Sequence, residues 1–164
     1  MSGFSHFDSQ GASRMVDVGN KEATYRIARA SGMIQMQAKT LQLIMNQGHV
    51  KGDVLGVARV AGIMATKRTA ELIPMCHPLA LETVQVDFKP FENDAILIEA
   101  TVAVTAKTGV EMEALTAVSA AALTVYDMCK SVDRSMTICK IQLEEKSGGR
   151  SGHFLRSDAC ASKG

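Results

Sequence analysis

Residues 84–105 read VQVDFKPFENDAILIEATVAVT, two alternating runs separated by a turn. The first run covers residues 84–88, where apolar and polar side chains alternate, and the alternation resumes over 96–105. A period of two indicates half-buried strands, and the acidic and amide residues at 92–94 are typical of a turn. The segment therefore predicts an antiparallel β-hairpin.

The segments on either side of this hairpin set the topology. Before it, residues 24–36 alternate as a strand, residues 39–46 fit a short helix, and a second helix opens at Asp53, a good N-cap residue. After it, we expect a long helix over residues 108–132 and a last strand over 136–144. The order strand, helices, strand, strand, helix, strand predicts an α+β fold of the ferredoxin-like βαββαβ kind, an antiparallel sheet with helices packed on one face.

The two ends of the chain differ in composition from its middle. Residues 2–13 and 147–164 are rich in Ser and Gly, and we expect flexible tails at 1–13 and 155–164 around one folded domain at 14–154. The chain has 164 residues, 46% of them hydrophobic, which suits a single domain with a real core. The N-terminus lacks the basic start and apolar run of a signal peptide, so we expect a cytoplasmic protein without a membrane segment.

Charge and cysteine content limit the partners. Lys and Arg number 18 and Asp and Glu 17, so the net charge of +1 gives no overall attraction to nucleic acid or to an anionic membrane. Any anion must therefore be bound by a local group of cations. The four cysteines show no CxxC spacing, and we expect free thiols and no zinc or other metal site.

The long helix has no charged residue from Ala114 to Tyr126, although this run is shorter than the ~20 residues that span a bilayer. A helix that is apolar all round must be covered all round. The sheet covers one side. Either the segment 39–69 covers the other side within the same chain, or a partner subunit does. We favour the partner and expect a homo-oligomer.

Polar clusters mark both ends of this helix. Glu113 and Asp127 are fourteen residues apart, which places them within ~40° around the axis but roughly 21 Å apart along it. Either only one end is functional, or the two ends meet across a subunit boundary. Thr108 and Glu111 also fit a capping box, and Asp127 with Lys130 fits a surface ion pair. The apolar sequence before Asp127 favours partial burial and a functional role for the pair.

Three loops concentrate the remaining polar groups. Residues 48–53 (GHVKGD) place Lys51 before a helix N-terminus, which suits a phosphate, although GxxxxGK[ST] is absent and most such lysines are simply solvated. Residues 73–78 (IPMCHP) hold a thiol and an imidazole between two prolines that stiffen the loop, but no further metal ligands are evident. Residues 146–152 (KSGGRSG) are basic, and the alternative for them is a disordered tail.

These motifs together resemble the molybdenum cofactor biosynthesis protein C family, the cyclic pyranopterin monophosphate synthases. The most specific stretches are IPMCHPL at 73–79, KTGVEMEALT at 107–116 and YDMCK at 126–130. MVDV at 15–18 and KSGG at 146–149 also match, and all run in the family order between about residues 14 and 154.

The resemblance implies a lyase that converts 3′,8-cyclo-7,8-dihydroguanosine 5′-triphosphate to cyclic pyranopterin monophosphate and pyrophosphate. It implies catalytic roles for Asp127, Lys51 and Lys130. The substrate contacts that it implies are Met75, Cys76, His77, Met112 and Glu113. It also places the site between subunits of a hexamer built as a trimer of dimers, in agreement with the helix-length argument. The resemblance leaves open whether a divalent cation binds beside the triphosphate.

The residue types suit this chemistry. Opening and reclosing the purine-derived rings needs proton transfer, and an Asp beside a Lys serves it, because the ammonium keeps the carboxylate ionised and itself exchanges a proton. Closing the cyclic phosphate while pyrophosphate leaves needs cations. We expect Lys51, Lys146 and Arg26 to hold phosphate, and His77 and Glu113 to contact the base or ring edges.

Two other classes compete with this interpretation. An RNA-binding ferredoxin-like domain needs stacking aromatics on its strands, but the chain has 2 Tyr, 5 Phe and no Trp, and no RNP-like motif. A non-catalytic ligand-binding ferredoxin-like oligomerisation module explains the oligomer. It does not explain why charged groups gather in so few loops.

Overall fold

The computed structural model describes residues 6–8, 10–46, 53–150 and 152–157. Lys51 and one of the four cysteines, Cys160, lie outside the described residues. The elements, in chain order, are β1 (Thr24–Gln35), α1 (Ala38–Met45), α2 (Val54–Thr66), α3 (Thr69–Leu72), β2 (Thr83–Phe91), β3 (Ala95–Ala106), α4 (Glu111–Cys129), β4 (Thr137–Ser147) and β5 (Phe154–Leu155).

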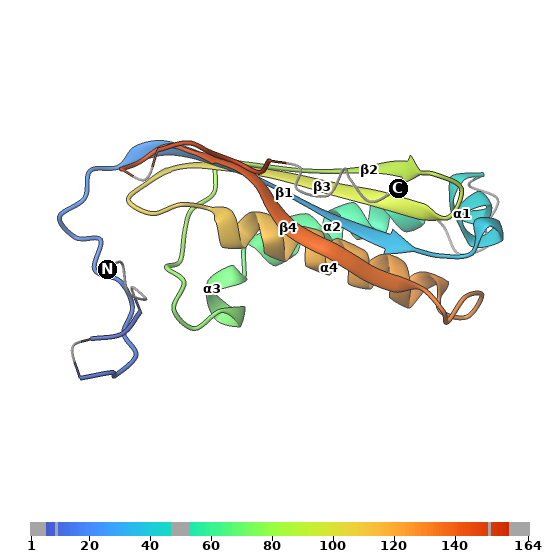
Figure 1. Ribbon diagram of the computed structural model, residues 1–164, viewed down its shortest axis with the longest axis horizontal. Coiled ribbons are helices and arrows are strands. Elements are labelled where there is room, and N and C mark those ends of the chain that lie inside the picture. Colours follow the sequence, from blue (N-terminus) through green and yellow to red (C-terminus); the bar gives the residue numbers. More distant parts are fainter. Residues whose placement is uncertain (1–5, 9, 47–52, 151, 158–164) are drawn as a thin grey trace.

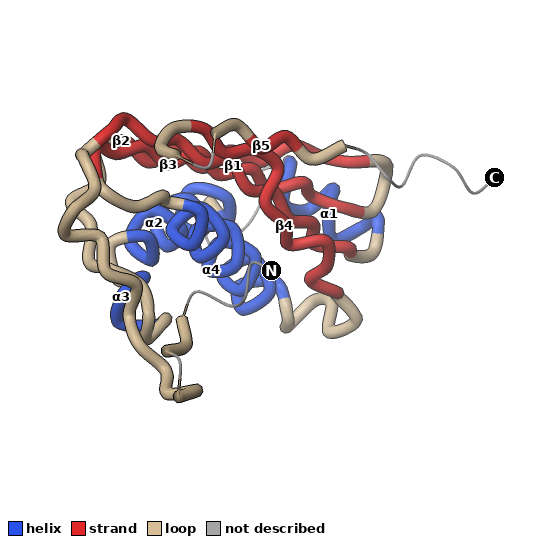
Figure 2. The backbone as a smooth tube through the Cα atoms, turned by 60° about the vertical axis from the view of Figure 1, so that its left-hand side comes forward, coloured by secondary structure: helices blue, strands red, loops and turns tan. Residues whose placement is uncertain are grey.

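The sheet has the order β2-β3-β1-β4-β5, and every neighbouring pair is antiparallel. Its four long strands have the ferredoxin-like arrangement, with α2 and α4 lying against one face (Figures 1 and 2). The predicted α+β fold is confirmed. The hairpin of β2 and β3 closes between Phe91 and Ala95, at the expected turn.

The core lies between the sheet and α4. Buried alanines on the helix, among them Ala114, Ala117 and Ala121, let it lie close to β1 and β3. Glycine is required at one such contact, because a Cβ at Gly32 of β1 would lie 2.5 Å from a methyl group of Val118.

Helix α2 covers a second side of α4. It begins after Asp53, whose carboxylate accepts a hydrogen bond of 2.8 Å from the Gly56 amide, as the N-cap prediction required. It approaches α4 at Gly62, where an added Cβ would lie 3.0 Å from the Ala117 carbonyl oxygen. Cover from within the chain is therefore correct for this side of α4. A third side of α4 is covered by neither the sheet nor α2, and Leu123 on that side is 61% exposed.

Several boundaries differ from the prediction. Helix α4 begins and ends about three residues inside the expected range, and neither α3 nor β5 was expected. The last predicted strand extends to Ser147, and β5 pairs with Glu145 and Lys146 at its end. Near the N-terminus, Phe7 forms an isolated bridge with Ser13. No helix among the described residues is long and apolar enough to cross a membrane.

Candidate active site

A cavity of about 320 Å³ lies at the N-terminal end of α4. Its lining contains all five substrate contacts that the family resemblance implies: Met75, Cys76, His77, Met112 and Glu113. Apolar side chains of Val16, Val18 and Leu79 complete part of its wall. We call it the base cavity. Three segments far apart in the sequence meet there: the N-terminal segment, the loop before β2 and the start of α4 (Figure 1).

Local backbone contacts hold the loop with Met75 to His77 in place. A turn closes where the Cys76 amide donates a hydrogen bond of 3.0 Å to the Ile73 carbonyl oxygen, directly after α3. At the other end, the Glu82 amide donates a hydrogen bond of 3.1 Å to the Ala103 carbonyl oxygen and leads the chain into β2. The loop is therefore anchored on both sides of its thiol and imidazole.

Glu113 is the most buried charged group of the base cavity, with 4% of its surface exposed. Burial raises its pKa, and the neighbouring negative charge of Glu111 adds to this. The pKa of the Cys76 thiol is also raised, first by burial and then by the charge of Glu113. A carboxyl group that takes up a proton readily can donate a hydrogen bond to a ligand.

Glu111 lies at the rim of the base cavity and forms an ion pair of 2.9 Å with Lys146. The capping-box alternative is wrong. The N-cap position of α4 is Val110, which makes no side-chain cap bond, and Glu111 is the first residue of the helix. Lys146 reaches Glu111 from β4, where it pairs with Ala28 of β1. This predicted phosphate ligand therefore lies beside the base cavity.

A second cavity, of about 620 Å³, lies next to the first, and Lys21 lines both. We call it the cation cavity, because Lys21, Arg26 and Arg150 all line it. Arg26 is held in place, since its Nε donates a hydrogen bond of 2.9 Å to the Ala106 carbonyl oxygen. Gly149, with φ of 74°, lies against the Arg26 guanidinium, where a larger residue would overlap it. Three cations around one cavity suit a polyanion.

Asp127 and Lys130 lie at the other end of α4. Their side chains form an ion pair of 2.5 Å, and the hydrogen bond to Asp127 raises the pKa of Lys130. The predicted partial burial is wrong for a single chain, because the two side chains are 70% and 57% exposed. The helical rise places Asp127 roughly 21 Å from Glu113. One chain therefore does not bring the predicted catalytic pair to the base cavity.

Residues 15–149 match the model of the MoaC family. The chain belongs to the MoaC family. Cyclic pyranopterin monophosphate synthase 3 of Mycobacterium tuberculosis is 61% identical over 94% of this chain and 87% of its own length. The synthase of Thermomicrobium roseum is 59% identical over 96% of both chains. That of Desulfitobacterium hafniense is 58% identical over 93% of this chain and 94% of its own.

Sequence reasoning missed several residues that line the two cavities of this MoaC chain. Lys21 and Arg150 line the cation cavity, and Val16 and Val18 the base cavity. The signal was present for both valines, since they belong to the MVDV match, and for Arg150, which lies in the basic loop 146–152. Within the described part of this MoaC chain, no group of three or more His, Cys, Asp or Glu is placed to hold a metal ion.

Proposed function

We propose that this MoaC chain is a cyclic pyranopterin monophosphate synthase, a lyase of molybdenum cofactor biosynthesis. Its substrate is 3′,8-cyclo-7,8-dihydroguanosine 5′-triphosphate, and its products are cyclic pyranopterin monophosphate and pyrophosphate. The observation that carries the proposal is the pair of adjoining cavities, which share Lys21. One is partly apolar and suits a fused ring, and the other, where three cations outnumber the single carboxylate of Glu22, suits a triphosphate.

The base cavity supplies the ring contacts in this proposal. Met75 and Leu79 flank the faces of the fused ring, while His77 and Glu113 contact its polar edges. Because the pKa of Glu113 is raised, its carboxyl group carries a proton more readily than an exposed one and donates a hydrogen bond to a ring acceptor. Ring recognition then depends on a few polar groups in an otherwise apolar wall.

The cation cavity holds the triphosphate. A sugar oxygen attacks the α-phosphorus, the bond to the bridging oxygen breaks, and pyrophosphate leaves with the negative charge. Arg26 and Lys21 neutralise that charge, because both line the cavity in which the leaving group develops. Lys146, at the rim of the base cavity, and Lys51 add cations to the same polyanion.

Asp127 and Lys130 perform the proton transfers, with Lys51, as the catalytic groups of the proposed enzyme. A neighbouring subunit must supply them, because they lie at the far end of α4 from the base cavity. We therefore propose a homo-oligomer, a hexamer built as a trimer of dimers, with each site shared between two chains. We also propose a cytoplasmic location, which suits the reduced thiols of Cys76, Cys129 and Cys139.

The test is an incubation of the purified protein with the cyclic dihydroguanosine triphosphate. We expect release of pyrophosphate together with cyclic pyranopterin monophosphate, in equal amounts. Arg26→Ala should weaken substrate binding, whereas Lys89→Ala, which removes an exposed cation on the opposite face of the sheet, should not. Substrate binding without pyrophosphate release would instead identify a non-catalytic ligand-binding module.

A further inference from the structure

The N-terminal segment contributes one wall of the base cavity. Its lining residues there are His6, Val16, Val18 and Lys21. In both views the segment lies at the same end of the molecule as α3 and the loop that follows α3 (Figures 1 and 2). The two valines and Lys21 belong to the stretch that leads into β1, whereas His6 lies ten residues before Val16. His6 reaches the cavity because the chain turns back on itself.

A short hairpin makes this turn. The Arg14 amide donates a hydrogen bond of 2.9 Å to the His6 carbonyl oxygen, and Phe7 bridges Ser13 in the antiparallel sense. The backbone of His6 is therefore fixed beside Arg14, two residues before the first valine of the cavity wall. Residues 6–8 and 10–14 form what we call the N-terminal hairpin.

Asp8 closes the tip of the N-terminal hairpin. Its carboxylate accepts hydrogen bonds of 2.9 Å from the Ala12 amide and of 2.9 Å from the Gln10 amide. These two bonds, the one from Ala12 first, lower the pKa of Asp8. Gly11 has a φ of 82°, which a glycine adopts without strain and which lets the chain reverse. The hairpin thus has a cap of its own and does not depend on packing against the core.

The other end of the segment is attached to the loop before α4. The Lys107 ammonium donates a hydrogen bond of 2.7 Å to the Gly19 carbonyl oxygen. The Asp17 carboxylate accepts one of 2.8 Å from the Gly19 amide, and the Lys21 amide donates one of 3.1 Å to the Val18 carbonyl oxygen. The wall that carries His6 is therefore held at both ends.

The side chain of His6 has hydrogen-bonding capacity to spare. Within the described part of the chain, its imidazole makes no hydrogen bond and no ion pair, and the residue is exposed. Glu111, at the rim of the same cavity, is instead paired with Lys146. A neutral imidazole offers one N–H donor and one nitrogen acceptor. The hairpin therefore brings an unused donor and acceptor to the base cavity.

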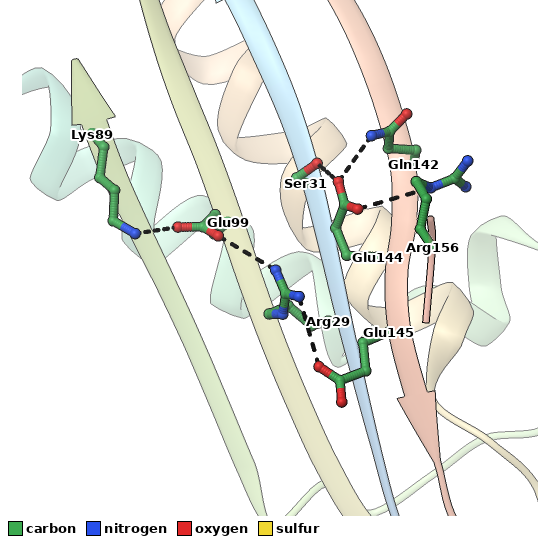
Figure 3. Close-up of polar contacts among 8 residues, drawn as sticks. All are labelled: Arg29, Ser31, Lys89, Glu99, Gln142, Glu144, Glu145 and Arg156. Carbon is green, nitrogen blue, oxygen red and sulfur yellow. Dashed lines mark hydrogen bonds and ion pairs between the residues drawn. The ribbon is translucent and has the colours of Figure 1, made fainter. Parts of the chain in front are cut away.

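The charged groups on the open face of the sheet differ in this respect. Figure 3 shows Arg29 between Glu99, at 3.5 Å, and Glu145, at 3.6 Å, and Lys89 also pairs with Glu99. These side chains are matched by partners within the chain and need no ligand. The contrast favours the base cavity, and His6 in particular, as a place where a ligand completes the polar contacts.

We propose that His6 is a further substrate-binding residue, whose imidazole forms a hydrogen bond with the polar edge of the guanine-derived ring. This inference rests on the proposed function, which places that ring in the base cavity. The ring keeps the carbonyl oxygen and the exocyclic amine of guanine, an acceptor and a donor. Either one matches a neutral imidazole. Asp8 does not touch the substrate and is a positioning residue that acts through His6.

Two ligands test the contact by calorimetry. Guanosine 5′-triphosphate carries both the base and the polyanion, whereas inorganic triphosphate carries the polyanion alone. His6→Ala should weaken binding of the nucleotide about 5–10-fold, the loss of one hydrogen bond, and leave the affinity for inorganic triphosphate unchanged. The matched control is Gln10→Ala, which changes an exposed side chain of the same hairpin, keeps the backbone bond to Asp8 and should alter neither affinity. Unchanged nucleotide binding by His6→Ala, or an equal loss of both ligands, would overturn the proposal.

Two further variants distinguish a contact from a structural role. His6→Asn keeps a donor and an acceptor, so it should recover part of the nucleotide affinity that His6→Ala loses. Asp8→Ala should show the same selective loss as His6→Ala, and the double variant should lose no more than either single one. Additive losses would show that Asp8 does not act through His6. Equal affinities of His6→Asn and His6→Ala would contradict the hydrogen bond.

Pyrophosphate release from the cyclic dihydroguanosine triphosphate, measured on the same preparations, separates this inference from the proposed function. We expect His6→Ala to raise KM about 5–10-fold with little change in kcat. Normal turnover by the native protein, with KM unaffected by His6→Ala, would retain the function and reject the role of His6. No turnover by the native protein, with a selective loss of nucleotide binding in His6→Ala, would reject the function and retain the base contact.

Discussion

The Lys146 ammonium lies 2.9 Å from the Glu111 carboxylate, an ion pair that joins β4 to the first turn of α4. Both side chains are only 27% exposed, so the pair is partly shielded from solvent at the rim of the base cavity. Glu111 therefore fixes the position of a cation that the proposed function assigns to the triphosphate.

Lys146→Ala should raise the KM for the triphosphate about 10-fold or more, because a charge-assisted contact of ~1.5–3 kcal/mol is lost. Glu111→Gln keeps the Lys146 cation but removes the ion pair that holds it in place, so we expect a smaller increase in KM. The KM and kcat of pyrophosphate release check both variants. A larger defect in Glu111→Gln than in Lys146→Ala would show that Glu111 has a direct role of its own.

Asp127→Asn should lower kcat by ~10²–10⁴-fold, the usual contribution of a general acid or base. The substitution preserves shape and removes only the charge of an exposed side chain, so the oligomeric state should not change. Asp87→Asn, on the opposite side of the sheet, is the matched control. Near-normal turnover of Asp127→Asn with an unchanged particle mass would contradict the catalytic assignment.

Mixing two inactive variants should restore activity. Asp127→Asn alters the end of α4 that the proposed function assigns to the site of a neighbouring subunit, whereas His77→Ala alters the base cavity. In a random mixture about half of the dimers are mixed, and each of these has one intact site, so about a quarter of native activity should return. The measurement is kcat after the two chains are refolded together. No recovery in confirmed mixed dimers would mean that each site is built from one chain.

Glu113→Gln should stabilise the fold while it impairs the enzyme. At pH values below the usual pKa of 4.5, Glu113 is protonated in both the folded and the unfolded chain, so it carries no charge that could change the free energy of unfolding. As pH rises above that value, the unfolded chain ionises first, so the native protein loses stability relative to the variant. We expect a higher Tm for Glu113→Gln at pH 7 and a much smaller difference at pH 4. The same difference in Tm at both pH values would show that the ionisation of Glu113 is not the cause.

Asp133→Ala should destabilise the protein by ~2–3 kcal/mol without directly affecting the two cavities. Asp133 is 1% exposed and accepts hydrogen bonds of 2.8 Å from the Gln37 amide and 2.6 Å from the Ser135 hydroxyl. It thereby joins the end of α4 to the start of α1, and these bonds lower its pKa to about 2.

The pH dependence of unfolding gives a second measurement on Asp133. Its contribution is complete above the usual pKa of 3.8 and is lost as pH falls through about 2. Denaturant unfolding at pH 7 and at pH 2.5 should therefore show a steeper acid loss in the native protein than in Asp133→Ala. If the native protein and Asp133→Ala lost the same free energy of unfolding between pH 7 and pH 2.5, the Asp133 carboxylate would not be the cause of the acid loss.

Local patterns in the sequence were enough to predict most of the fold. The hairpin, the Asp53 cap and the long helix each depend on neighbouring residues, and all three are present. The start of α4 was misjudged because a long-range partner, Lys146, takes the Glu111 carboxylate that a capping box would use. Strand β5 has two residues and no periodicity of its own.

The site was predictable only in part, for a related reason. The loop at 73–78 and the start of α4 were found from their motifs, and the structure brings them together in the base cavity. The cation cavity combines residues 20–26 with Gly149 and Arg150, which are neighbours only after β1 and β4 pair. The spacing of residues within either segment does not indicate that the two segments lie close together.

The length of α4 makes protein concentration part of the proposed chemistry. With Asp127 roughly 21 Å from Glu113, a dissociated chain would hold an incomplete half of two different sites. Specific activity should then decline on dilution, and recovery after reconcentration should follow second-order kinetics. An enzyme built in this way would lose activity whenever the concentration of its own chain is low, without any inhibitor.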